Sequence, residues 1–158
     1  ELPSELTING PIELEIRLKL NDSKGLLSAQ ILDFGPKKRL EDKARVKDFK
    51  VLDRGRNFML DDLVELPLVE SPYQLVTKGF TNLQNKDLLT VSDLKADEWF
   101  TLKFELQPTI YHLEKADKLR VILYSTDFEH TVRDNRKVTY EIDLSQSKLI
   151  IPIESMKK

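Results

Sequence analysis

The 158-residue sequence contains no cysteine. This absence excludes thiol nucleophiles, cysteine-ligated zinc and disulfide bonds. A chain of this length can bury roughly 68–70% of its unfolded surface, so it needs neither a metal nor a disulfide to fold. The lack of cysteine also suits a reducing cytoplasm.

Long apolar runs, a basic excess and glycine-rich loops are missing too. No stretch of about 18 apolar residues is present, which excludes a membrane-spanning helix. Lys and Arg number 25 against 27 for Asp and Glu, so the net charge is -2. A dedicated nucleic-acid binder would carry a basic excess. The 5 glycines form no phosphate loop. We therefore expect no nucleic-acid partner, no membrane partner and no cofactor.

The chain opens with Glu1-Leu2-Pro3-Ser4, without an initiator Met and without a secretory leader. We expect it to be a piece of a longer chain. Its length fits one domain over residues 1–158.

What the sequence has in abundance is alternation of apolar and polar residues. Between residues 12 and 20 every second side chain is apolar: Ile12, Leu14, Ile16, Leu18 and Leu20. Period two predicts an extended strand with one apolar face. The polar loop 21–25 follows, and 26–34 reads as a second strand. We expect these two strands to pair as a hairpin.

The remaining pattern predicts an all-β chain. Further strands are expected at 100–106, 119–125, 138–144 and 149–153, and weaker ones at 45–52, 73–80 and 109–113. The strand at 119–125 is dense enough in apolar residues to be buried on both faces. Short helical turns are expected only at 61–66 and 91–96. Eight to ten short strands indicate a two-sheet β-sandwich with jelly-roll topology.

Few residues suggest catalysis or metal binding. There are 2 histidines, His112 and His130, and no Gly-x-Ser-x-Gly elbow. Asp127, Glu129 and His130 could offer metal ligands, but their spacing fits neither a calcium loop nor a zinc helix. We expect instead that Asp127 pairs with Arg133 or Arg136 across a polar turn.

Two further features leave alternatives open. Residues 36–56 hold nine basic and four acidic side chains, and 57–72 hold four acidic and no basic ones. These segments form either a solvated, self-neutralising loop pair or a docking surface. The aromatic residues form either part of the core or a platform that stacks a sugar ring: Tyr73, Phe80, Trp99, Tyr111 and Tyr124.

Specific strings then resemble a known family. They are TINGP at 7–11, LSAQILDFG at 27–35, KGFTNLQN at 78–85, LQPTIYHL at 106–113, YSTDFEHTVRDN at 124–135 and YEIDL at 140–144. Together they resemble the C-terminal, galactose-binding-like jelly-roll domain of bacterial Xaa-Pro dipeptidyl-peptidases, relatives of the cocaine-esterase-like hydrolases. The chain departs from the family pattern at Lys115-Ala116-Asp117, where a glycine-containing turn is expected, and at Lys78, where relatives often carry Arg.

The resemblance implies a parent enzyme of the α/β-hydrolase type. That parent would be a cytoplasmic, homodimeric serine peptidase that releases Xaa-Pro dipeptides from peptide N-termini. Its Ser, Asp and His would lie upstream of this chain, which would itself be non-catalytic and would pack on the upstream domain. A carbohydrate-binding module and a self-contained hydrolase are the alternatives.

The family's loops suggest a docking surface. Its candidate residues are Lys78, Asn82, Gln84, Asn85, Thr126, Asp127, Thr131 and Arg133. The same side chains could instead satisfy the backbone of their own loops.

Overall fold

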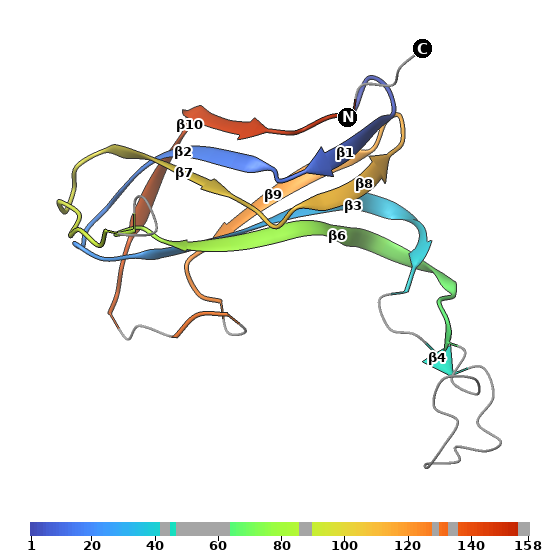
Figure 1. Cartoon of the computed structure of the whole chain (residues 1–158), viewed down its shortest axis with the longest axis horizontal. Coiled ribbons are helices and arrows are strands. Elements are labelled where there is room, and N and C mark those ends of the chain that lie inside the picture. Colours follow the sequence, from blue (N-terminus) through green and yellow to red (C-terminus); the bar gives the residue numbers. More distant parts are fainter. Residues whose placement is uncertain (42–44, 47–63, 86–89, 128–129, 133–135, 155–158) are drawn as a thin grey trace. The chain divides into compact units, whose positions relative to one another are not determined.

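The computed structural model describes residues 1–41, 45–46, 64–85, 90–127, 130–132 and 136–154. These residues form strands and no helix (Figure 1). The strands are β1 (Leu6–Gly10), β2 (Glu13–Leu20), β3 (Leu26–Leu40), β4 (Arg45–Val46), β5 (Val64–Glu65), β6 (Leu68–Asn82), β7 (Phe100–Glu105), β8 (Thr109–Leu113), β9 (Lys118–Tyr124) and β10 (Tyr140–Ile150). The prediction of an all-β fold is confirmed. Within the described ranges, no helix is long and apolar enough to cross a membrane.

The chain divides into two compact units. The larger unit comprises Glu1–Asp33 and Leu75–Lys158, and the smaller one comprises Phe34–Gln74. The expectation of one domain over the whole chain stays a prediction, as does the jelly-roll order of the strands.

In the larger unit, β2 is the central strand of the sheet β10-β2-β7. Its partners are antiparallel, with Ile16 opposite Leu102 of β7 and Leu18 opposite Ile142 of β10. The apolar side chains of β2 are at most 3% exposed. The period-two pattern therefore predicted both the strand and its buried face.

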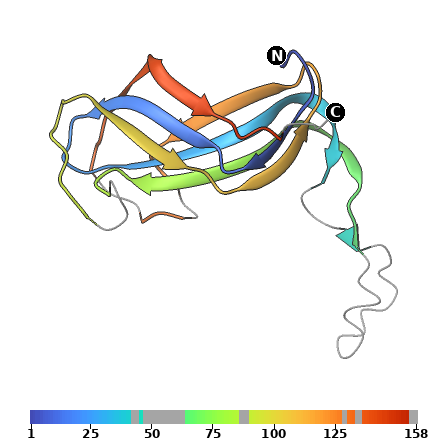
Figure 2. The same ribbon diagram turned by 45° about the horizontal axis from the view of Figure 1, so that its top comes forward.

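A second sheet has the order β6-β3-β9. Leu27, Ala29 and Ile31 of β3 belong to the same apolar core as the β2 side chains. Figures 1 and 2 show the two sheets as separate layers. The expected hairpin between 12–20 and 26–34 is thus wrong. The loop at 21–25 carries the chain from one sheet to the other, because two strands with one apolar face each can both be buried when those faces meet across a core.

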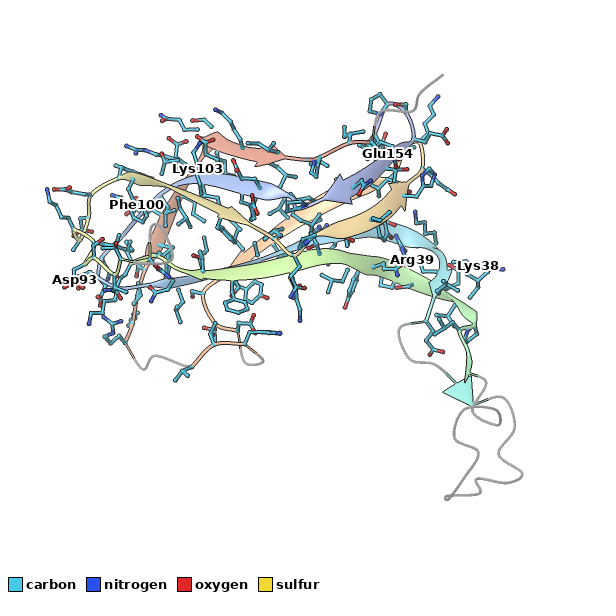
Figure 3. All side chains as sticks on the ribbon, in the orientation of Figure 1. Lys38, Arg39, Asp93, Phe100, Lys103 and Glu154 are labelled. Carbon is cyan, nitrogen blue, oxygen red and sulfur yellow. The ribbon has the colours of Figure 1, made fainter. Side chains whose placement is uncertain are left out.

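The strand β1 was not predicted, because Asn9-Gly10-Pro11 reads as a turn. It pairs antiparallel with β8, Leu6 opposite Leu113. The other edge of β1 meets the last described residues, where the amide of Glu154 donates to the carbonyl of Thr7 at 3.0 Å (Figure 3).

The strands expected at 138–144 and 149–153 form largely one element, β10, with an irregularity between Asp143 and Lys148. Asp143 Oδ1 accepts hydrogen bonds from the amide of Ser145 at 2.9 Å and from its hydroxyl at 2.6 Å. The hydroxyl bond, more than any other cause, lowers the pKa of Asp143 below its ordinary value. The charged carboxylate thus closes the bulge.

Two local predictions are wrong. Residues 91–96 form no helical turn, because their amides bond elsewhere: Ser92 donates to Gln84 and Leu94 to Ser23. The strand at 119–125 is not buried on both faces, since Val121 is 40% and Ile122 37% exposed. The turn expected at 61–66 falls partly outside the described residues, and Val64–Glu65 within it is strand β5.

In the smaller unit, Arg39 is buried rather than displayed. It is 4% exposed, and its Nη1 donates to the carbonyls of Gly35 at 2.7 Å and Ser71 at 2.6 Å. This side chain ties the distal parts of β3 and β6 together. The charge of Arg39 is therefore not available to the suggested docking surface at 36–72. Most of the residues of that surface lie outside the described ranges.

The turn between β8 and β9 contains an alanine where the family resemblance led us to expect a glycine. Ala116 has a φ of 71°, in the left-handed region. That conformation costs a residue with a Cβ about 1–2 kcal/mol. The turn is held by the amide of Glu114, which donates to Asp117 Oδ2 at 2.9 Å.

Ala116→Gly should therefore raise the free energy of unfolding by up to about 1 kcal/mol. Glycine relieves the strain of the left-handed conformation, but part of that gain is lost because glycine also increases the conformational entropy of the unfolded chain. Urea denaturation would measure the change. Ala29→Gly, at a buried position of β3, is the control and should destabilise the chain. Equal losses in both variants would contradict the assignment of strain to Ala116.

Candidate functional site

A half-open cavity of about 730 Å³, lined by both polar and apolar side chains, lies in the larger unit. Its walls come from the loop that joins β2 to β3, the end of β6, and the segment between β9 and β10. These elements are far apart in sequence. The cavity therefore combines side chains that no single sequence motif contains.

The structure brings half of the predicted site residues to this cavity. Asn82, Gln84, Thr126 and Thr131 line it. Asp127 lies between Thr126 and Thr131 in sequence, but it does not belong to the lining. Lys78 and Asn85 also lie outside the lining, and Arg133 lies outside the described residues. The role of all eight in docking stays a prediction.

Asn82 and Gln84 stabilise the turn that follows β6. Asn82 Oδ1 accepts the amide of Gln84 at 3.1 Å. Gln84 Nε2 donates to Asp93 Oδ1 at 2.7 Å; Asp93 is labelled in Figure 3. Asn85 closes the turn with a bridge to Val91. The side chains of Asn82 and Gln84 thus satisfy groups of their own loop, whereas Asn85 contributes its backbone.

Asp127 organises the segment after β9. It is 7% exposed, and its Oδ1 accepts the amide of His130 and contacts His130 Nδ1, both at 3.2 Å. Its Oδ2 accepts the Tyr124 hydroxyl at 3.3 Å, and its carbonyl accepts the Thr131 hydroxyl at 2.7 Å. One buried carboxylate therefore fixes both the strand end and the loop.

The expected partner of Asp127 was an arginine. Arg136 donates from Nη1 to Asp22 Oδ1 at 2.6 Å, Arg133 lies outside the described residues, and the pairing of Asp127 with either arginine stays a prediction. The contact of Arg136 with Asp22 joins the loop before β3 to the segment before β10, residues 114 positions apart in the chain. It positions Arg136 at the cavity wall.

Tyr140 and Gly25 form the apolar side of the cavity. The Tyr140 hydroxyl donates to the carbonyl of Leu26 at 3.0 Å and accepts its amide at 3.2 Å. A Cβ on Gly25 would lie 2.9 Å from that hydroxyl and 2.8 Å from Leu20 Cδ1. Only glycine fits there without displacing either neighbour.

Sequence reasoning assigned no function to Lys24, Tyr140 or Val138, although all three line the cavity. Lys24 stands in a polar loop and the other two in a strand pattern, so no local signal marked them. To find them, one would have had to know that the loop at 21–25 lies beside the strand that begins near residue 138.

The histidines make local contacts. His112 is exposed, with Nδ1 3.2 Å from Thr7 Oγ1. The His130 ring lies against Phe80, with ring centroids 5.6 Å apart. Within the described ranges, no group of three His, Asp or Glu side chains could hold a metal ion. Glu129, one of the three residues considered for a metal, lies outside those ranges.

Four of the five aromatic side chains suggested as a sugar platform, all except Tyr73, have separate partners. Trp99 lies under the ammonium of Lys19, 5.3 Å from the ring centroid. Tyr111 donates to Asp33 Oδ2 at 3.0 Å, and Tyr124 accepts a bond from Gln30 Nε2 at 3.2 Å. In the part of the chain that the structure describes, no ring contact joins two members of the proposed platform.

Asp127→Ala should lower the free energy of unfolding by about 1–3 kcal/mol, because Tyr124 and the amide of His130 lose a charged acceptor in a buried place. Denaturation monitored by fluorescence, with amide exchange of residues 124–131, would measure it. Glu98→Ala is the control: it removes an exposed ion pair with Lys95 and should cost at most about 1 kcal/mol. A loss no larger than the control's would contradict the anchoring role.

Comparison with known proteins places this geometry in a family. The family model described as the X-Pro dipeptidyl-peptidase C-terminal non-catalytic domain matches residues 1–156. The Xaa-Pro dipeptidyl-peptidase of Streptococcus gordonii is 51% identical over 152 residues, which cover 96% of this chain and 20% of that protein. The sequence from S. gordonii strain Challis matches equally, at 51% identity. The chain therefore spans about a fifth of the length of these relatives.

Solved structures support the fold. Two crystal structures of a CocE/NonD family hydrolase from Staphylococcus aureus superpose with TM-scores of 0.59 and 0.57 at 16% and 17% identity. They cover 98% and 97% of this chain, which corresponds to 29% of each of theirs. With the family match over almost every residue, the chain belongs to the X-Pro dipeptidyl-peptidase C-terminal non-catalytic domain family.

Proposed function

We propose that this chain is the accessory domain of an Xaa-Pro dipeptidyl-peptidase and that it packs on the catalytic part of the same protein. The observation that carries the proposal is the match of residues 1–156 to a domain described as C-terminal and non-catalytic. In this proposal the parent is a serine peptidase that releases Xaa-Pro dipeptides, and its reacting groups lie in an α/β-hydrolase domain upstream.

The outer face of the sheet β6-β3-β9 supports the packing role. On β9, Leu119 and Leu123 pack toward the core, so alternation places Ile122 and Tyr124 on the opposite face. Tyr124 meets Gln30 of β3 on that face. Ile122 is 37% exposed there, an apolar side chain on a sheet face that a partner can cover.

The occupant we assign to this face is the rest of the parent chain. The chain covers only 20% of the Streptococcus gordonii relative, so most of that protein lies outside it. A domain linked covalently to its neighbour needs little intrinsic affinity, because the linker keeps the effective concentration high. A face of modest apolar area is then enough for stable packing.

The proposal extends to the complete enzyme as a cytoplasmic homodimer. The lack of cysteine is compatible with a reducing compartment. The dimer rests on the family resemblance alone. Size-exclusion chromatography of the complete protein tests it.

The complete protein should hydrolyse a chromogenic Gly-Pro amide, and the 158-residue chain should not. A serine-directed inhibitor should abolish the parent's activity, which identifies the nucleophile class. Turnover by the 158-residue chain alone, sensitive to that inhibitor, would overturn the proposal.

Ile122→Asp should destabilise the complete protein by at least about 2 kcal/mol, because the substitution buries a carboxylate in the interface. The same change in the isolated chain should have a much smaller effect, since Ile122 is 37% exposed there. Calorimetry of both forms measures the difference. Leu144→Asp, at a position 77% exposed on β10, is the matched control. An equal effect of Ile122→Asp in both forms would contradict the assigned interface.

A further inference from the structure

Among the described residues, the charged side chains that line the cavity are all of one sign. Its described lining contains Lys24 and Arg136 but no Asp or Glu. Among the described residues Lys24 has no ion-pair partner, and its backbone amide, not its ammonium, bonds Asp22. Arg136 gives Nη1 to Asp22, so the cavity retains at least the positive charge of Lys24. A cavity of this kind attracts an anion.

Several lining groups are also donors that find no acceptor among the residues that the structure describes. The hydroxyls of Ser125 and Thr126 make no hydrogen bond to the described residues, whereas Thr131 Oγ1 is already bonded to the carbonyl of Asp127. Asn82 uses its Oδ1 to hold Gln84, which leaves the amide nitrogen available. Two hydroxyls, an amide and an ammonium match the acceptor-rich surface of an oxyanion.

One side of the wall is apolar and held by hydrogen bonds. Tyr140 and Leu26 are joined by two hydrogen bonds, and Val138 adds apolar surface. On the other side, Asp127 fixes the loop that carries Thr126 and Thr131. A volume of about 730 Å³ is typical of cavities that bind small molecules. Because the hydrogen bonds of Tyr140 and of Thr131 are present without a ligand, these two groups need no ordering on binding.

We propose that this cavity binds a small organic molecule that carries a carboxylate or phosphate group, with the oxyanion at Lys24 and the hydroxyls of Ser125 and Thr126, and the organic part against Tyr140 and Val138. This binding activity is separate from docking on the catalytic domain. It does not depend on the proposed function.

Isothermal titration calorimetry of the complete protein tests the proposal, with citrate, inorganic phosphate and galactose as probes at low ionic strength. Citrate or phosphate should bind saturably, and the affinity should fall as salt is added. Tighter binding of citrate would indicate a carboxylate ligand, and tighter binding of phosphate a phosphorylated one. Galactose, which has no charge, should bind much more weakly.

The anion affinities of three variants test whether binding occurs in this cavity. Lys24→Gln should weaken the anion about tenfold, since it removes a charge-assisted contact. Thr126→Ala should weaken it less. Lys115→Gln is the matched control, because Lys115 is an exposed lysine outside the cavity and likewise has no ion-pair partner in the described part of the chain. Melting temperatures of all variants confirm that they fold.

Three results would overturn the proposal. One is the absence of saturable binding of either anion. Another is anion binding that Lys24→Gln leaves unchanged. The third is binding of galactose as tight as that of the anions.

Discussion

The burial of β2 is the constraint on which the rest of the larger unit depends. It lies between β10 and β7, and its apolar side chains are almost inaccessible to water. Burying one such side chain contributes about 1.5–3 kcal/mol. Because all of them point to one face, a second layer has to cover that face, and β3 provides it. The passage of the chain from sheet to sheet follows from this need.

The same constraint explains what could be predicted from sequence. Alternation identifies which face of a strand is buried, so β2, β7 and β8 were expected at nearly their observed bounds. Alternation does not identify the strand's neighbours. Residues 12–20 and 26–34 were expected to pair because they are adjacent in sequence, yet the core required them in opposite layers. β1 was missed because turn-forming residues at its end masked a short strand.

The candidate site was predictable only in part, for a related reason. Family-like strings marked the loops around residues 82–84 and 126–131, and those loops do line the cavity. The opposite wall, with Lys24 and Tyr140, depends on contacts between residues 114 positions apart, such as that of Tyr140 with Leu26. Such contacts leave no local pattern. For the aromatic residues the sequence left a core role and a sugar platform open; Phe80, Trp99, Tyr111 and Tyr124 each have a partner of their own, whereas Tyr73 is 52% exposed.

The position of β1 has a consequence for the order of folding. β1 bonds β8 on one edge and residues 152–154 on the other, so both of its partners lie far from it in the sequence. Contacts between such distant residues slow folding, because a long loop must close before they form. During translation the second edge of β1 therefore stays available for wrong pairing until residues 152–154 have been made. The synthesis of residues 152–154, rather than local structure, then determines when β1 can be paired on both edges.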